Sequence, residues 1–152
     1  MIDYMKLGID RAMQTSSEGV GGPFGAVIVK NGEVVAVANN SVLKDNDPTA
    51  HAEINAIRLA CKNLNTYDLT GCVLYTTCEP CPMCMSAIIW SNIKTIYYGA
   101  TAKDAEEIGF RDDYIYNFIK NDCKDEKIMQ LNQVERAKCL ELFKAYKGKT
   151  IY

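Results

Sequence analysis

The sequence predicts an α/β protein, a three-layer α/β/α sandwich around a five-stranded mixed sheet. Short β-branched runs alternate with segments of helical period, which favours a sheet with helices on both faces. The first two strands are joined by a tight turn and the later strands by helices, so antiparallel and parallel pairs share the sheet. The composition, 48% hydrophobic and 24% charged in 152 residues, suits one globular domain over residues 1–152.

The N-terminal part is expected to form a helix followed by a β-hairpin. Residues 3–18 have helical spacing, and a glycine-rich segment with one proline ends them. Residues 24–30 contain three consecutive β-branched residues and predict the first strand. Asn31-Gly32 predicts a two-residue turn, because both residues tolerate positive φ. Residues 33–39 then return as the second strand.

The middle of the chain alternates helices and strands. Residues 40–48 are polar and form a loop. Residues 49–63 carry apolar residues at intervals of three and four, which indicates a helix. Residues 72–77 predict the third strand and residues 94–99 the fourth. Between them a helix begins at the prolines 80 and 82 and ends near residue 90, since proline at the first helical position removes no backbone hydrogen bond.

The C-terminal part is less regular. A further helix is expected from about residue 101. Residues 111–126 are expected to form a polar segment that contains a short aromatic stretch. Residues 127–134 predict the fifth strand and residues 135–146 the last helix.

Charge and cysteine content restrict the function classes. The net charge is −2, and residues 1–119 carry nine basic and fourteen acidic side chains, so we do not expect a nucleic-acid-binding protein. Residues 120–152 carry eight basic and five acidic side chains, which is only a weak basic bias. We expect neither an export signal nor a membrane span. Seven cysteines, an odd number, predict reduced thiols and a cytoplasmic location.

Two short motifs predict a metal centre. The first is His51-Ala52-Glu53, which contains the only histidine of the chain, and the second is Pro80-Cys81-Pro82-Met83-Cys84. An imidazole, two thiols and a nearby carboxylate are the components of a zinc site that activates water for nucleobase deamination. Both motifs fall at the starts of two successive crossover helices, which connect strands of the sheet. The helix starts at the end of such a sheet are common ligand-binding positions in α/β proteins.

The residue types suggest a role for each side chain. His51, Cys81 and Cys84 are the expected zinc ligands, because three protein ligands and one open position are typical of catalytic zinc. Zinc lowers the pKa of bound water towards about 7. Glu53 lies two residues from His51 and points elsewhere on a helix, so we expect it to move protons rather than bind the metal.

The non-enzymatic alternative is a protein with a structural zinc site. Cys78 lies three residues before Cys81, so Cys78, Cys81, Cys84 and His51 would complete a closed Cys₃His site. That site would leave Glu53 without a purpose. The remaining cysteines are expected to act as small core residues; they are Cys61, Cys72, Cys123 and Cys139.

With these residues in view, the chain resembles the cytidine-deaminase superfamily and, within it, the bacterial guanine deaminases. The zinc motifs carry the resemblance to the superfamily, whereas the segment around Asp112 and the terminal Tyr152 carry the narrower one. The matching stretches, in order, are residues 21–30, 46–53, 78–84 and 109–116.

The resemblance implies a cytidine deaminase-like fold with one Zn²⁺ per chain. It also implies a homodimer that exchanges the C-terminal segments, about residues 135–152. The implied reaction is zinc-dependent hydrolysis of the free nucleobase guanine to xanthine and ammonia, a step of purine metabolism. No membrane or nucleic-acid partner is expected.

By position, the resemblance also assigns substrate contacts. Asn40 would hydrogen-bond the purine and Ala52 would offer a backbone contact. Phe24 and Trp90 would line the pocket. Asp112 would hold the base and assist proton transfer, and Tyr152 would close the partner's pocket as a lid.

The residues themselves leave simpler interpretations open. Phe24 and Trp90 also fit core or interface aromatics, Asn40 a turn, and Tyr152 a frayed terminus. Asp113 is as acidic as Asp112, so the sequence does not decide which of them faces the substrate. Two other reactions fit the same zinc motifs, namely deamination of adenosine in tRNA and deamination of cytosine or another aminoazine.

Overall fold

The computed structural model describes all residues from 1 to 152. The chain forms two compact units, Met1–Asp113 and Tyr114–Tyr152; the expected single domain over residues 1–152 stays a prediction. The elements of the first unit are α1 (Tyr4–Ser17), β1 (Gly25–Lys30), β2 (Glu33–Asn39), α2 (Val42–Asp45), α3 (Ala52–Leu64), β3 (Cys72–Cys78), α4 (Pro82–Trp90), β4 (Thr95–Ala100) and α5 (Ala102–Glu107). The second contains α6 (Asp113–Lys120, beginning at the boundary) and α7 (Arg136–Tyr146).

The sheet is mixed, as the sequence predicts, but it has four strands. Their order is β2-β1-β3-β4, with β1 antiparallel to both β2 and β3, and β3 parallel to β4. The expected fifth strand over residues 127–134 is wrong. The apolar residues there, Ile128, Met129, Leu131 and Val134, fall on both even and odd positions, whereas a strand with one buried face needs them at every second residue.

The opening of the fold follows from local sequence signals. Asp3 caps α1 by accepting a hydrogen bond from the backbone N–H of Lys6 at 3.0 Å. Asn31 and Gly32 turn the hairpin with φ of 51° and 80°. A side chain at Gly25 would overlap the carbonyl of Gly8, so this glycine lets β1 approach α1 closely.

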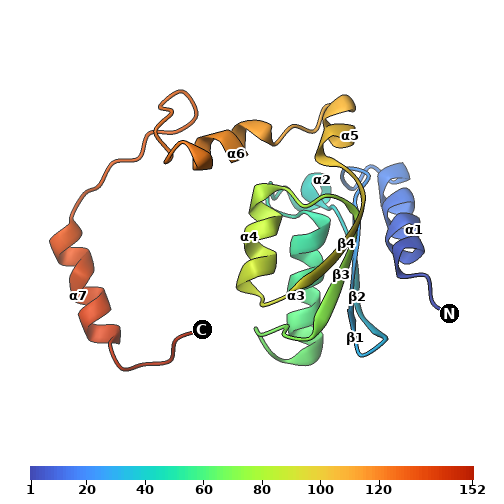
Figure 1. Ribbon diagram of the computed structural model, residues 1–152, viewed down its shortest axis with the longest axis horizontal. Helices are drawn as coiled ribbons and strands as arrows, with labels where there is room; N and C mark the ends of the chain where they lie inside the picture. The colour runs from blue at the N-terminus through green and yellow to red at the C-terminus, as the bar shows by residue number, and fades with distance from the viewer. The chain divides into compact units, whose positions relative to one another are not determined.

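Helices cover both faces of this sheet within the first unit. In Figure 1, α1 lies on one side of the strands, and α3 and α4 lie on the other. Strand β1 is buried on both faces, whereas β3 alternates between buried and half-buried residues. Ile28, Leu74 and Ile88 are central to the core between the sheet and α3 and α4. This packing holds the N-termini of α3 and α4 at fixed positions.

The second unit contains a helix that the sequence analysis missed. In α6, Ile115, Phe118 and Ile119 lie at intervals of three and four, which is a helical period hidden among polar and aromatic residues. The last helix, α7, was predicted within one residue at its start. None of the helices combines the length and the apolar character needed to cross a membrane.

Candidate metal centre and active site

Two helix starts carry the metal-binding motifs. His51 is the N-cap of α3, with extended backbone angles, and Glu53 lies in the first turn of that helix. Cys81 is the N-cap of α4, Pro82 is its first residue, and Cys84 lies one turn further in. Figure 1 shows α3 and α4 side by side with both helices beginning at the same end of the sheet. Two motifs about thirty residues apart therefore meet.

The three expected ligands form one cluster. The Nδ1 atom of His51 lies 3.6 Å from the Sγ of Cys81 and 3.5 Å from the Sγ of Cys84. One donor atom from each residue lies within 4.8 Å of the others. This is the only grouping of His51 with cysteines, and it holds three ligand atoms, the number expected for catalytic zinc.

The two thiols of the cluster differ in acidity. Hydrogen bonds from the Cys84 thiol and from His51 lower the pKa of Cys81 to about 4. The same hydrogen bond with Cys81, together with burial, raises the pKa of Cys84. The hydrogen bond with Cys81 also raises the pKa of His51. A thiolate is thus already favoured at the cluster, and thiolate is the form in which cysteine binds zinc.

Cys78 does not join this cluster. Its sulfur donates to the carbonyl of Thr101 at 3.6 Å and is not among the three clustered donor atoms. Burial, with the negative charges of Glu53 and Asp112 nearby, raises the pKa of Cys78 to about 11. A thiol that stays protonated is a poor metal ligand, so the closed Cys₃His alternative lacks its fourth member.

Glu53 is a buried carboxyl group beside the cluster. Its side chain is 6% exposed, and burial raises its pKa. The Thr76 hydroxyl donates to its Oε1 at 3.1 Å, and the Cys84 thiol lies 3.5 Å from its Oε2. A carboxyl group in such a place can exchange protons with a reactant bound next to the cysteines.

Several of the expected substrate-binding residues lie on the same unit. Asn40 is buried, and its Oδ1 accepts hydrogen bonds from the backbone N–H of Gly22 at 3.2 Å and of Val42 at 3.1 Å. Ala52 is fully buried at the start of α3. Phe24 is half-buried and meets Phe110 edge to face, with ring centroids 5.0 Å apart. Sequence reasoning did not assign Phe110 a role.

The two neighbouring aspartates differ in their surroundings. Asp113 is exposed and forms an ion pair with Arg111 at 3.1 Å. Asp112 is half-buried, and burial together with the negative charge at Cys81 raises its pKa. Asp112 is therefore the aspartate that interacts electrostatically with the cysteine cluster.

Of the two remaining expected site residues, one lies far along α4 from Cys81 and the other belongs to the second unit. Trp90 is the last residue of α4 and is 78% exposed, about 13 Å along the helix from Cys81. Tyr152 belongs to the second compact unit. Their roles as pocket wall and lid stay predictions.

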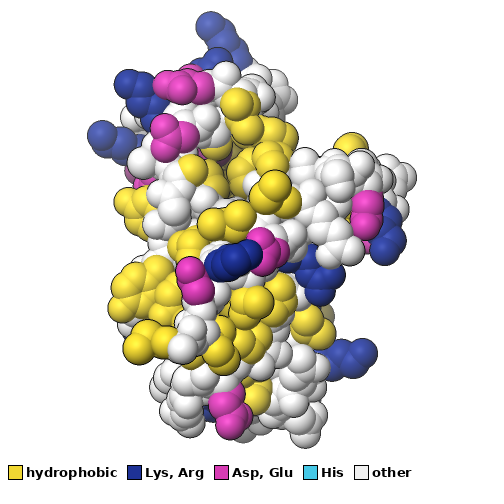
Figure 2. All heavy atoms as spheres, turned by 90° about the vertical axis from the view of Figure 1, so that its right-hand side faces the viewer, with side chains coloured by type: hydrophobic (Ala, Val, Ile, Leu, Met, Phe, Trp, Pro, Cys, Tyr) yellow, Lys and Arg dark blue, Asp and Glu magenta, His cyan; other side chains and the backbone are white.

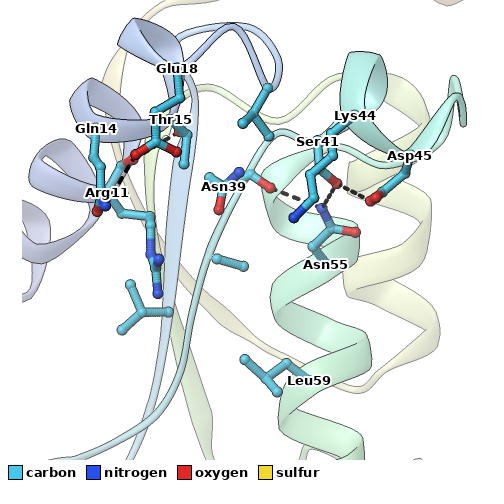
Figure 3. Close-up of a pocket in the computed structure, with 13 residues that line it drawn as sticks. Arg11, Gln14, Thr15, Glu18, Asn39, Ser41, Lys44, Asp45, Asn55 and Leu59 are labelled. Atoms are coloured by element: carbon cyan, nitrogen blue, oxygen red, sulfur yellow. Dashed lines mark hydrogen bonds between the residues drawn. The ribbon is translucent and has the colours of Figure 1, made fainter.

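A hollow lies at the β2 edge of the sheet and contains hydrogen bonds that connect two segments of the candidate site. It has a volume of about 360 Å³ and opens between α1, β2 and α2. In Figure 3, Asn55 points into it and donates to the carbonyl of Asn39 and to the hydroxyl of Ser41, each at 2.9 Å. These bonds fasten the segment that carries Asn40 to α3, the helix that carries Glu53.

Comparison with known proteins agrees with this geometry. Residues 2–100 match the family model described as "Cytidine and deoxycytidylate deaminase zinc-binding region". The chain belongs to this family. It is a zinc-dependent deaminase, a hydrolase that acts on C–N bonds, with an α/β cytidine deaminase-like fold.

Individual relatives of this deaminase include enzymes that act on different substrates. A guanine deaminase from Bacillus subtilis is 46% identical over 95% of this chain and 92% of its own length. A solved structure of guanine deaminase from B. subtilis has a TM-score of 0.90 at 44% identity, covering 98% of this chain and 96% of the other. A tRNA-specific adenosine deaminase from Buchnera aphidicola is 39% identical over 92% of this chain and 91% of its own length.

Proposed function

We propose that this deaminase hydrolyses the amino group of free guanine, giving xanthine and ammonia. The observation that carries the proposal is the near full-length likeness to the B. subtilis guanine deaminase structure, with a TM-score of 0.90 over 98% of the chain. A structure from a study of tRNA A34 deaminases reaches a TM-score of 0.63 over 64% of the chain. The likeness to guanine deaminase thus extends past the zinc motifs, through the segment with Asp112.

The metal would be held by His51, Cys81 and Cys84. The donor set fits zinc, because an imidazole and two thiols converge and one thiol is already acidic. Two thiolates balance the charge of the ion, so the loaded site is neutral. Zinc held in this way lowers the pKa of a water molecule, which supplies the nucleophile that hydrolysis needs.

Glu53 would carry the protons of the reaction. Hydrolysis at carbon 2 of guanine forms a C–O bond and breaks the bond to the amino nitrogen, which keeps its two hydrogens and gains one. Glu53 would accept one proton from the water and deliver it to a ring nitrogen. It would then move the remaining proton, from the new hydroxyl on carbon 2, to the amino group, which leaves as ammonia while the carbonyl of xanthine forms. Its raised pKa suits a group that must alternately accept and donate.

Four residues of the first unit would orient the base. The Oδ1 of Asn40 is occupied by two backbone N–H groups, so its NH₂ group is left to donate to an acceptor on the ring. The N–H of Ala52 is among the first of α3, which have no partner within the helix. Phe24 would contact the ring face, and Asp112 would accept from ring N–H groups. A base that leaves these buried groups unpaired is disfavoured.

Deamination of adenosine in tRNA is the competing function. The curated relatives include tRNA-specific adenosine deaminases, as the Buchnera protein illustrates. RNA binding requires a basic surface, and this chain has a net charge of −2 with the acidic excess in residues 1–119. The charge therefore favours a small uncharged substrate.

We also propose that the deaminase is a cytoplasmic homodimer whose C-terminal segments are exchanged, serving purine metabolism. Both units leave large apolar side chains exposed: Trp90 by 78%, Tyr97 by 53% and Phe143 by 71%. The α1 side of the molecule likewise has many hydrophobic side chains at its surface (Figure 2). A second copy that covered Trp90 and Tyr97 would bury such groups. All seven cysteines are free, which fits a reducing compartment.

The test is ammonia release from guanine, adenine, cytosine, guanosine, cytidine and an anticodon stem-loop RNA, with zinc content measured in parallel. We expect guanine to be the preferred substrate. Glu53→Gln should keep zinc and lose about 10²- to 10⁴-fold in turnover. Glu33→Gln, an exposed glutamate at the hairpin, is the matched control and should retain wild-type turnover. Preference for cytosine or for the RNA would overturn the proposal.

A further inference from the structure

Thr76 is a buried polar residue in the middle of the sheet. It lies on β3 opposite Ala26 of β1 on one side and Tyr98 of β4 on the other, so its backbone is fixed by two neighbouring strands. Its side chain is 1% exposed and shares the buried face of β3 with Cys72 and Leu74. A polar group in such a place is expected to have a specific hydrogen-bond partner.

That partner is the carboxylate of Glu53. The Thr76 hydroxyl donates to Oε1 at 3.1 Å, while the Cys84 thiol lies on the other oxygen, Oε2, at 3.5 Å. The two oxygens of the carboxylate are thus contacted by different groups. Thr76 comes from the rigid sheet, whereas Cys84 belongs to the metal cluster.

We propose that Thr76 is a positioning residue for Glu53, and that its hydrogen bond fixes Oε1 so that Oε2 is the oxygen that exchanges protons. This inference rests on the proposed function. A cysteine bound to zinc is a thiolate and has no proton to donate, so in the loaded enzyme Thr76 is the side chain that still donates to the carboxylate. The β-branched side chain of threonine has few rotamers and holds its hydroxyl in place.

The consequence concerns the rate rather than substrate binding. Proton transfer depends on the placement of the carboxylate to within a fraction of an ångström. Thr76 touches Glu53 and does not itself need to contact the base. Loss of its hydroxyl should therefore lower kcat and leave KM nearly unchanged.

The experiment compares Thr76→Val, which has nearly the same shape without the hydroxyl, with Thr76→Ser, which restores a hydroxyl. We expect T76V to lower kcat for guanine about 10- to 100-fold, the range for a lost hydrogen bond to a charged group. KM should stay within about threefold, and zinc content should match the wild type. T76S should recover most of kcat.

A matched control is available at the next residue. Thr77 lies on the opposite face of β3, and its hydroxyl accepts from the backbone N–H of Gly25 at 3.0 Å. T77V therefore also removes a hydrogen bond from the same strand, but it should leave kcat within about twofold of the wild type because Thr77 does not contact Glu53. An equal loss in T76V and T77V would assign Thr76 a merely structural role.

A measurement on the metal-free protein separates this inference from the proposed function. T76V and Glu53→Ala should each change the melting temperature, and the shift of the double variant should differ from the sum of the single shifts, because both substitutions remove the same contact. If the wild type released no ammonia from guanine, the proposed function would fail while this coupling still tested the contact. Additive shifts, or wild-type kcat in T76V, would overturn the positioning role. T76A replaces T76V in both measurements if the valine variant does not fold.

Discussion

Cys78 and Cys81 are three residues apart, yet their thiols lie in opposite environments. Cys81 begins a helix beside His51 and Cys84, and its pKa falls to about 4. Cys78 ends a buried strand near two carboxylates, and its pKa rises to about 11. Two cysteines only three residues apart thus differ strongly in acidity: the thiol of the metal cluster is acidic, and the other stays protonated.

Serine substitutions test this separation. Cys81→Ser and Cys84→Ser should each lose bound zinc on dialysis, because only two protein ligands remain. Cys78→Ser should retain about one zinc per chain and measurable ammonia release, since its sulfur bonds the backbone of Thr101 and Glu79 and is not among the clustered donor atoms. Metal content is measured on purified protein by mass spectrometry. Loss of zinc from Cys78→Ser would restore the closed Cys₃His site.

Among the site residues, the sequence could identify those in dense motifs. His51, Glu53, Cys81 and Cys84 have side chains whose chemistry has few other uses at that spacing. Thr76 was missed, because threonine is common in strands and its partner lies 23 residues away. The alternation of β3, which buries the even-numbered residues, would have placed a hydroxyl on the core face and could have indicated it.

At the scale of elements, local signals account for most of the first unit. The hairpin strand Glu33–Asn39 was predicted to the residue, and α1, α3 and β3 to within about three residues at each end. Strong local signals explain this success, namely the turn dipeptide Asn31-Gly32 and the prolines 80 and 82 at the start of α4. The fifth strand, which was predicted but is absent, and α6, which is present but was not predicted, both lie after residue 110. No Asn-Gly turn or proline marks the element ends there.

The hairpin turn supplies a prediction at this scale. Gly32 has φ of +80°, and a Cβ there would meet only the hydroxyl of Tyr4 at 4.0 Å, so the cost of a side chain is backbone strain alone. Gly32→Ala should lower the free energy of unfolding by about 1–2 kcal/mol, measured by urea denaturation. Asn31→Gly keeps an easy positive φ and should cost less. Equal stability of Gly32→Ala and the wild type would contradict the assigned turn.

At the scale of the whole molecule, the sequence carries less information. The zinc cluster needs only elements of the first unit, but the predicted pocket wall and lid are Trp90, at the far end of α4, and Tyr152, in the second unit. In the proposed homodimer their contribution depends on how the two chains associate, and exposed apolar side chains such as Leu142 and Phe143 of α7, both about 70% exposed, would favour association. Helical period alone does not reveal which copy covers that surface.

Subunit complementation decides whether the C-terminal segment acts in the partner's site. Glu53→Gln removes the proposed proton carrier but keeps the tail, and Tyr152→Ala keeps that carrier but removes the proposed lid, so each variant alone should have low activity. In a dimer with exchanged tails, the mixed species has one site with both intact residues, and co-expression in equal amounts should restore about one quarter of wild-type ammonia release. Without exchange, each chain pairs its own tail with its own site, and co-expression yields no more than the average of the two variants.

Tyr152→Phe, which keeps the ring, is the control and should stay near wild type. Recovery of activity above that average requires that residues of two chains complete one active site.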